Sequence, residues 1–158
     1  MTRRRPFVIA AAAFLVALAA LAGLVVISSL GPGWSSKGLA PGERIFRYGL
    51  DSGGRPIPRS GGMMMMSSGC AGCHGRDGRG RTTRMYAAPD ITYANLTDPQ
   101  GMLDPDGTRG PAFTDAALRT AVTEGVDPEG DHLSWPMPRW NLTDAQWADL
   151  LAYLKSLL

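Results

Sequence analysis

Two cysteines three positions apart, followed directly by a histidine, constrain this chain more than any other stretch of it. The stretch is Cys70-Ala71-Gly72-Cys73-His74. On one turn of helix, residues i, i+3 and i+4 share a face, so both thiols can reach one edge of a porphyrin and bond to its two vinyl groups. His74 then points toward the ring centre, where an imidazole nitrogen binds iron. The spacing is that of a covalent attachment site for haem c.

Other chemistries also use two cysteines at this spacing, namely a redox dithiol, a disulfide and half of a zinc site. A thioredoxin-type dithiol requires a βαβ setting, which the sequence does not indicate. A structural zinc site requires about four Cys or His ligands, and the chain has 2 Cys and 2 His. Because the fourth of these ligands would be the distant His132, we prefer the haem interpretation.

The pentapeptide resembles the signature of the class I, monohaem cytochromes c of the membrane-anchored bacterial type. This resemblance implies an all-α fold, a small helical domain around one covalent haem c, with a histidine and a methionine as axial iron ligands. It covers residues 41–158. Residues 50–62 depart from the family, which runs from its first helix straight into the signature. The prolines and glycines of this insertion forbid a continuous helix, so the packing of the first helix is left open.

An uncharged apolar stretch precedes the domain. Three arginines lie within residues 1–6, and Phe7–Ile27 carries no charge. Its length is close to the roughly 20 residues that a helix needs to cross a bilayer. The alternative is a cleaved signal peptide that ends at Ala20-Leu21-Ala22, but the apolar stretch continues beyond that point. We therefore expect an uncleaved transmembrane anchor.

The anchor predicts where the protein lies. We expect residues 7–30 to form a single transmembrane helix, with residues 1–6 in the cytoplasm because positive flanks stay inside. Residues 31–40 are rich in Gly and Ser and form a tether. Residues 41–158 would then lie on the periplasmic side of the cytoplasmic membrane.

A methionine between two prolines is the second informative feature. Pro136 and Pro138 hold Met137 in extended backbone, since each proline fixes its own φ and restrains the residue before it. The segment resembles the Met-Pro ligand loop of the family. The resemblance implies that His74 and Met137 are the axial ligands of the iron, a pair that raises the reduction potential. Met102 and His132 are the rival ligands.

Four further residues are candidates for the haem environment. The resemblance implies that the Pro89 carbonyl accepts a hydrogen bond from the far nitrogen of the haem histidine, which fixes the ring and raises its basicity. Trp135 and Trp140 are candidates to wall the haem crevice, and Arg139 is a candidate to contact a propionate.

Helix signals frame the domain. We expect a short helix over residues 42–49 closed by Gly49, a helix over 116–124 capped by Thr114, and a final helix that begins with the capping box of Thr143 and Gln146. The apolar stripe of the final helix should pack on Ile45, Phe46 and the region Met63–Met66. We interpret those four methionines as a flexible apolar face rather than as a copper site, because consecutive residues point around a helix in all directions.

Charge is divided unevenly within a formal net charge of +2. Residues 37–89 contain nine basic and three acidic residues, whereas residues 90–158 contain four basic and eleven acidic ones. The glycine loop after His74 carries Arg76, Arg79, Arg81 and Arg84. This pattern is typical of a solvated surface or of a dipolar carrier that orients on a charged partner.

The resemblance implies an electron carrier rather than an enzyme. We expect single electrons to pass along a respiratory chain, to or within a terminal oxidase. The expected partners are redox proteins, with membrane contact and without nucleic acid or a small-molecule substrate. The alternatives are a haem subunit that relays electrons in a membrane dehydrogenase complex, and a haem enzyme or gas sensor with an open distal site.

Overall fold

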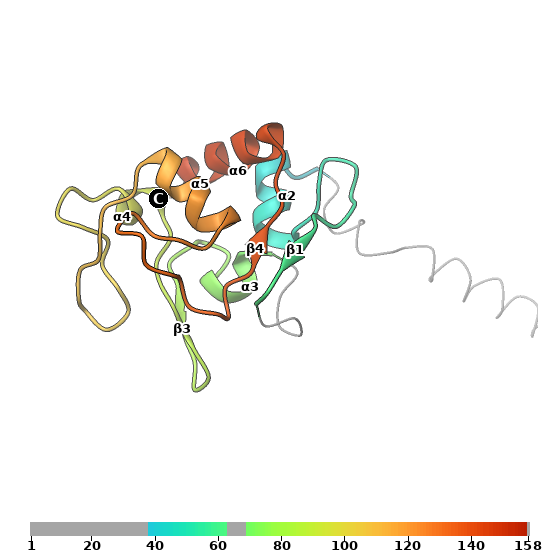
Figure 1. Ribbon diagram of the computed structural model, residues 1–158. Helices are drawn as coiled ribbons and strands as arrows, with labels where there is room; N and C mark the ends of the chain where they lie inside the picture. The colour runs from blue at the N-terminus through green and yellow to red at the C-terminus, as the bar shows by residue number, and fades with distance from the viewer. Residues whose placement is uncertain (1–37, 63–68, 158) are drawn as a thin grey trace, which may run out of the picture. The chain divides into compact units, whose positions relative to one another are not determined.

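The computed structural model describes residues 38–62 and 69–157, which belong to the second of two compact units, Gly38–Leu158. Helices dominate this unit, with some short strands (Figure 1). In chain order the elements are α2 (Pro41–Tyr48), β1 (Arg59–Ser60), α3 (Ala71–His74), β2 (Arg81–Thr82), β3 (Ala87–Ala88), α4 (Tyr93–Leu96), α5 (Asp115–Thr123), β4 (Arg139–Trp140) and α6 (Asp144–Ser156).

The crossing of α2 and α6 is the main helix contact of the unit (Figure 1). Gly42 allows the crossing, because a Cβ there would collide with the Asp149 carbonyl and the Tyr153 side chain. One turn later, the rings of Phe46 and Tyr153 are 5.2 Å apart between centroids. Ile45 and Phe46 are buried in the core with Leu150. The predicted packing of the last helix on Ile45 and Phe46 is therefore confirmed, while Met63–Met66 lies outside the described residues.

The helix ends follow the local signals in the sequence. Gly49 ends α2 in the left-handed conformation at φ 64°, which glycine adopts without steric cost. The Thr114 hydroxyl accepts from Ala117 N–H at 3.1 Å at the start of α5. Thr143 and Gln146 form the reciprocal capping box of α6. These three predictions are confirmed, with helix bounds that differ by one residue.

The structure adds two small antiparallel sheets to the predicted helices. β1 pairs with β4, so that Arg59 lies opposite Trp140 and Ser60 opposite Arg139. β2 and β3 form a hairpin in which Arg81 lies opposite Ala88. An all-α description is therefore incomplete. Strands of two residues carry no alternating pattern, and β1 and β4 pair across about eighty residues of chain, so local sequence does not reveal them.

Residues 50–62, the predicted insertion, fold onto the core. Leu50 and Pro56 form a β-bridge, and Ile57 is buried. Between them the Asp51 carboxylate accepts from Arg55 N–H at 2.8 Å and from Arg55 Nε at 3.0 Å. The backbone hydrogen bond from Arg55 is the main cause that lowers the pKa of Asp51. The insertion is thus an ordered loop, and it leaves the contact of α2 with α6 intact.

The predicted anchor, residues 7–30, and the tether over 31–37 lie outside the described residues. Within residues 38–62 and 69–157, every helix is too short or too polar to cross a bilayer.

Candidate haem site

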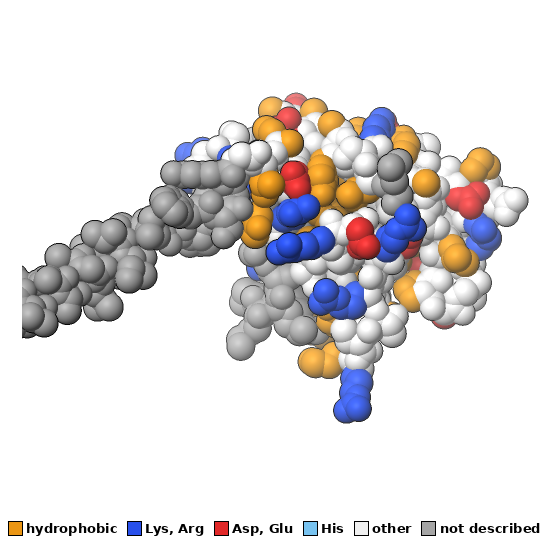
Figure 2. Space-filling view, turned by 180° about the vertical axis from the view of Figure 1, so that it is seen from behind, with side chains coloured by type: hydrophobic (Ala, Val, Ile, Leu, Met, Phe, Trp, Pro, Cys, Tyr) orange, Lys and Arg blue, Asp and Glu red, His pale blue; other side chains and the backbone are white. Residues whose placement is uncertain are grey.

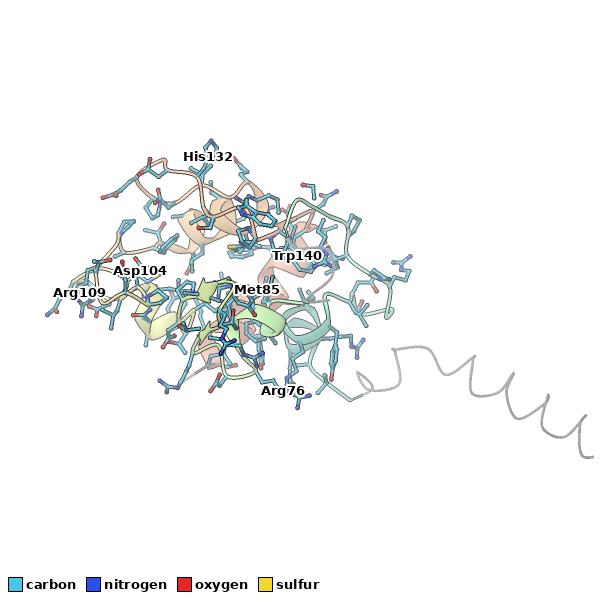
Figure 3. All side chains as sticks on the ribbon, turned by 90° about the horizontal axis from the view of Figure 1, so that it is seen from below. Arg76, Met85, Asp104, Arg109, His132 and Trp140 are labelled. Atoms are coloured by element: carbon cyan, nitrogen blue, oxygen red, sulfur yellow. The ribbon has the colours of Figure 1, made fainter. Side chains whose placement is uncertain are left out.

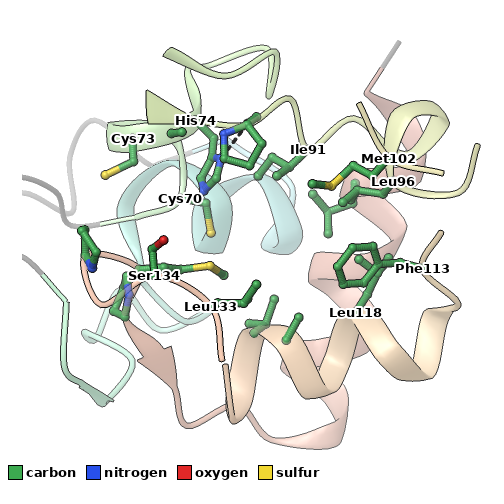
Figure 4. Close-up of a pocket in the computed structure, with 18 of the residues that line it drawn as sticks. Cys70, Cys73, His74, Ile91, Leu96, Met102, Phe113, Leu118, Leu133 and Ser134 are labelled. Carbon is green, nitrogen blue, oxygen red and sulfur yellow. Dashed lines mark hydrogen bonds between the residues drawn. The ribbon is translucent and has the colours of Figure 1, made fainter. Parts of the chain in front are cut away.

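An apolar cavity of about 300 Å³ lies within the unit. Its walls come from the region of α3, from α4, α5 and α6, and from the loop that precedes β4. Leu96, Phe113 and Leu118 line it on one side, with His74 and Cys70 on the other (Figure 4). An apolar wall of this kind suits a large planar hydrophobic group.

His74 ends α3 and is buried. Its Nδ1 lies 2.9 Å from the Pro89 carbonyl oxygen, the contact marked by the dashed line in Figure 4. Because a carbonyl only accepts, Nδ1 carries the proton and Nε2 keeps its lone pair. Burial lowers the pKa of His74, and the hydrogen bond to Pro89 opposes part of that shift. The imidazole is therefore neutral at pH 7, which is the form that binds a metal ion.

Gly80 holds the segment that presents Pro89. Its N–H donates to the His74 carbonyl at 2.8 Å. Its φ is 83°, and a Cβ would lie 2.5 Å from the Ala88 carbonyl oxygen and 2.7 Å from the Pro89 carbonyl carbon. Only glycine fits this close approach. Gly80 thus contacts the backbone of both residues that the His74–Pro89 hydrogen bond joins.

Cys70 and Cys73 both line the cavity, and neither is in a disulfide. Burial raises the pKa of the Cys70 thiol to about 12. Among the described residues, the Cys, His and acidic side chains close enough to share one metal ion are Asp127, Glu129 and Asp131. The alternative zinc ligands, which are the two cysteines, His74 and His132, therefore do not lie close enough together in the described residues to share one ion.

Met137 lines the same cavity as His74. Its N–H donates to the Ser134 carbonyl at 3.1 Å, so a turn presents the side chain. Met102 lines the cavity too and is buried. His132 is exposed and is not among the cavity residues; Figure 3 shows it at the edge of the molecule.

The three remaining candidates differ in their placement. Trp140 is buried and lines the cavity. Trp135 is 70% exposed and is not part of the lining. Arg139 is also outside the lining, and its guanidinium donates to the carbonyls of Met137 and Leu133 instead. The structure thus brings Trp140, but not Trp135 or Arg139, to the cavity.

Comparison with known proteins identifies the family. A family model described as cytochrome c matches residues 60–158. The chain belongs to the cytochrome c family. Searches of curated proteins and of solved structures gave no match.

The residues present fit the cofactor of this family, which is covalently bound haem c. The apolar cavity is lined by two thiols that are not in a disulfide and by a buried neutral imidazole. In this cytochrome Cys70 and Cys73 are suited to hold the porphyrin through thioethers, and His74 is suited to bind its iron. The chain is thus an electron-transfer haem protein.

Sequence reasoning missed several parts of the site. The wall residues Leu96 and Phe113 lie on or near α4, a helix that the sequence did not predict. The contact of Gly80 with Pro89 was also not foreseen, although the glycine-rich loop after His74 was its signal. The only sign of the cavity wall in the sequence is that apolar residues occur within polar loops. A single Phe or Leu in a loop does not indicate which cavity its side chain lines.

Proposed function

We propose that this cytochrome carries single electrons on the periplasmic face of the cytoplasmic membrane, with His74 and Met137 as the axial ligands of its haem. One observation carries the proposal: an imidazole already oriented by Pro89 and a thioether held in a tight turn line the same apolar cavity. A terminal oxidase, or another respiratory complex, is the proposed recipient of the electrons.

The protein side of the chemistry follows from these contacts. The bound haem supplies the change of one electron at its iron. The His74–Pro89 hydrogen bond keeps the imidazole in one orientation and one tautomer. The thioether of Met137 favours the reduced state and raises the potential. Leu96, Leu118 and Phe113 line the cavity and keep water out of it. Fewer water molecules must therefore reorient when the charge of the iron changes.

The β2–β3 hairpin is the proposed docking element for the partner. It projects from the unit (Figure 1), and Figure 2 shows Lys or Arg side chains at the end of the projection. Arg81 and Arg84 are exposed, and the apolar Met85 beside them is 72% exposed. In the turn of the hairpin, burial raises the pKa of the Tyr86 hydroxyl, and the neighbouring Cys73 adds to the shift. Basic side chains would therefore meet an acidic partner next to a haem attachment point.

A pair of methionine variants tests the ligand set. Met137→Ala is expected to remove the far-red absorption band of Met-ligated ferric haem, to lower the reduction potential and to allow CO to bind. Met102→Ala is the matched control, because Met102 is a second methionine in the lining of the same cavity. The control should keep the band and stay closed to CO.

Two outcomes would contradict the proposal. If the wild type lacks the band and binds CO rapidly, the distal site is open, as in a haem enzyme or gas sensor. If Met102→Ala abolishes the band while Met137→Ala keeps it, Met102 is the ligand. Subunits that co-purify from native membranes would then distinguish a free carrier from a fixed subunit of an oxidase or dehydrogenase.

A further inference from the structure

The loop that presents Met137 is held by residues 50–62, the segment that the sequence predicts to be an insertion. β1 (Arg59–Ser60) lies in this segment and pairs with β4, which begins one residue after Pro138, so that Met137 lies two residues before the strand (Figure 1). The pairing continues past the strand, since Asn141 N–H donates to the Pro58 carbonyl at 2.9 Å. The insertion therefore fixes the backbone on the C-terminal side of Met137.

Two further contacts join the same segment to the loop. The Arg59 guanidinium carbon lies 5.3 Å from the centroid of the Trp140 ring, a cation–π contact. Trp140 is buried in the cavity wall. Gly62 packs directly on Pro138, and a Cβ at Gly62 would lie 2.9 Å from the Pro138 nitrogen and Cβ. The insertion thus contacts the residue next to Met137 as well as the cavity wall.

Arg139 holds the loop from its other side. Its guanidinium donates to the Met137 carbonyl at 2.5 Å and to the Leu133 carbonyl at 2.9 Å. It passes over Gly125, where a Cβ would collide with it. The Leu133 N–H donates in turn to the Gly125 carbonyl at 2.9 Å. The end of α5, the Arg139 side chain and both ends of the Met137 turn therefore form one connected set.

We propose that the insertion and Arg139 clamp the Met137 loop and thereby determine how firmly the Met137 thioether stays on the haem iron. Gly62 and Arg139 are positioning residues: they act on the backbone of the loop and do not contact the iron. The inference rests on the proposed ligation by Met137. Hydrogen bonds from a charged donor to a carbonyl are among the stronger ones in proteins, so their loss should loosen the loop.

The first test compares two adjacent glycines. Gly61 and Gly62 have φ of 65° and 75°, so alanine is strained at both, but a Cβ at Gly61 meets nothing within 4 Å. Gly62→Ala should weaken the far-red band and raise the affinity of the ferric protein for added imidazole by about tenfold or more. Gly61→Ala should leave both unchanged.

The second test compares two arginines and stays valid if Gly62→Ala fails to fold. Arg139→Leu removes the donors to the Met137 loop. Arg109→Leu removes the same charge and a donor to the Gly101 carbonyl, on a loop that carries Met102 instead. Only Arg139→Leu should show the weaker band and the roughly tenfold gain in imidazole affinity.

The outcomes separate the two proposals. If the wild type shows the far-red band and the two members of each pair of variants behave alike, the clamp is overturned. The proposed ligation by Met137 then still holds. A wild type without the band overturns the ligation itself. A change in Arg109→Leu without one in Arg139→Leu overturns the clamp and points to Met102 as the ligand.

Discussion

At the scale of single residues, we expect the orientation of His74, the proposed haem ligand, to depend on a glycine. Gly80 contacts the Pro89 carbonyl group through its bare α-carbon and the His74 carbonyl through its N–H. Ala at this position would displace the Pro89 carbonyl and lengthen the hydrogen bond that makes the imidazole more basic. A less basic imidazole stabilises the ferric iron less.

We therefore predict that Gly80→Ala raises the reduction potential, measured by redox titration, and lowers the free energy of unfolding by about 1–3 kcal/mol more than backbone strain alone. Gly107→Ala is the control, because Gly107 has a similar φ of 87° and open space around it. The control should show the backbone strain, about 1–2 kcal/mol, without a shift of potential. Equal potentials in both variants would show that Gly80 does not act through Pro89.

The residues of the site were predictable to the extent that their chemistry is local. Cys70, Cys73 and His74 are adjacent in the sequence, and Met137 is marked by its flanking prolines. The contact of Gly62 with Pro138 joins residues far apart in the chain. Neither residue type nor spacing marks such a contact, because it depends on how the loops pack.

At the scale of elements, predictability follows the range of the interactions. The ends of α2, α5 and α6 were predictable because their caps lie within a few residues. The four short strands and α4 were not predicted. Their residues form regular structure only because a partner segment lies beside them, and the sequence does not show which segments meet.

An ion pair and a hydrogen bond on Asp115 join three of the helices and give the fold a pH dependence. The Asp115 carboxylate in α5 lies 2.7 Å from Lys155 Nζ in α6. The Tyr93 hydroxyl in α4 donates to the same carboxylate at 2.8 Å. The hydrogen bonds from Lys155 and Tyr93 lower the pKa of Asp115, and the one to Asp115 raises the pKa of Lys155. Stability from Asp115 is thus present above its unfolded pKa of about 3.9 and is lost as pH falls through the lower folded value. Stability from Lys155 is present below about 10.4 and is lost as pH rises through the raised value.

We predict that the melting temperature of Lys155→Met is lower than that of the wild type between about pH 4 and pH 10, and that the difference shrinks outside this window. Thermal unfolding across a pH series measures it. Both side chains of the pair are more than 40% exposed, so added salt should reduce the difference as well. If the difference in melting temperature changes with neither pH nor salt, the methylene contacts of Lys155, and not its charge, stabilise the fold.

At the scale of the whole molecule, charge is expected to direct the encounter with the partner. We predict that reversal of Arg79, Arg81 and Arg84 to Glu slows electron transfer to the membrane partner at low salt, by about tenfold or more. Stopped-flow oxidation of the reduced protein measures the rate, and high salt is the internal control because it screens exposed charges. The wild-type and variant rates should converge there. If the low-salt rates already agree, the hairpin is a solvated surface and the partner docks elsewhere.

The haem cavity does not depend on where the protein lies in the cell, because it is built from residues between Gly69 and Leu154. The expected anchor, residues 7–30, would act only by keeping the domain near a membrane partner, which raises its effective concentration. We predict that protein extracted from native membranes has the intact mass of the whole chain plus one haem. A variant in which a cleavable export signal replaces residues 1–37 should keep the spectrum and the potential but appear in the soluble fraction. Cleavage after Ala22 would instead give a lower mass and a soluble wild type, which would contradict the anchor while leaving the haem site unaffected.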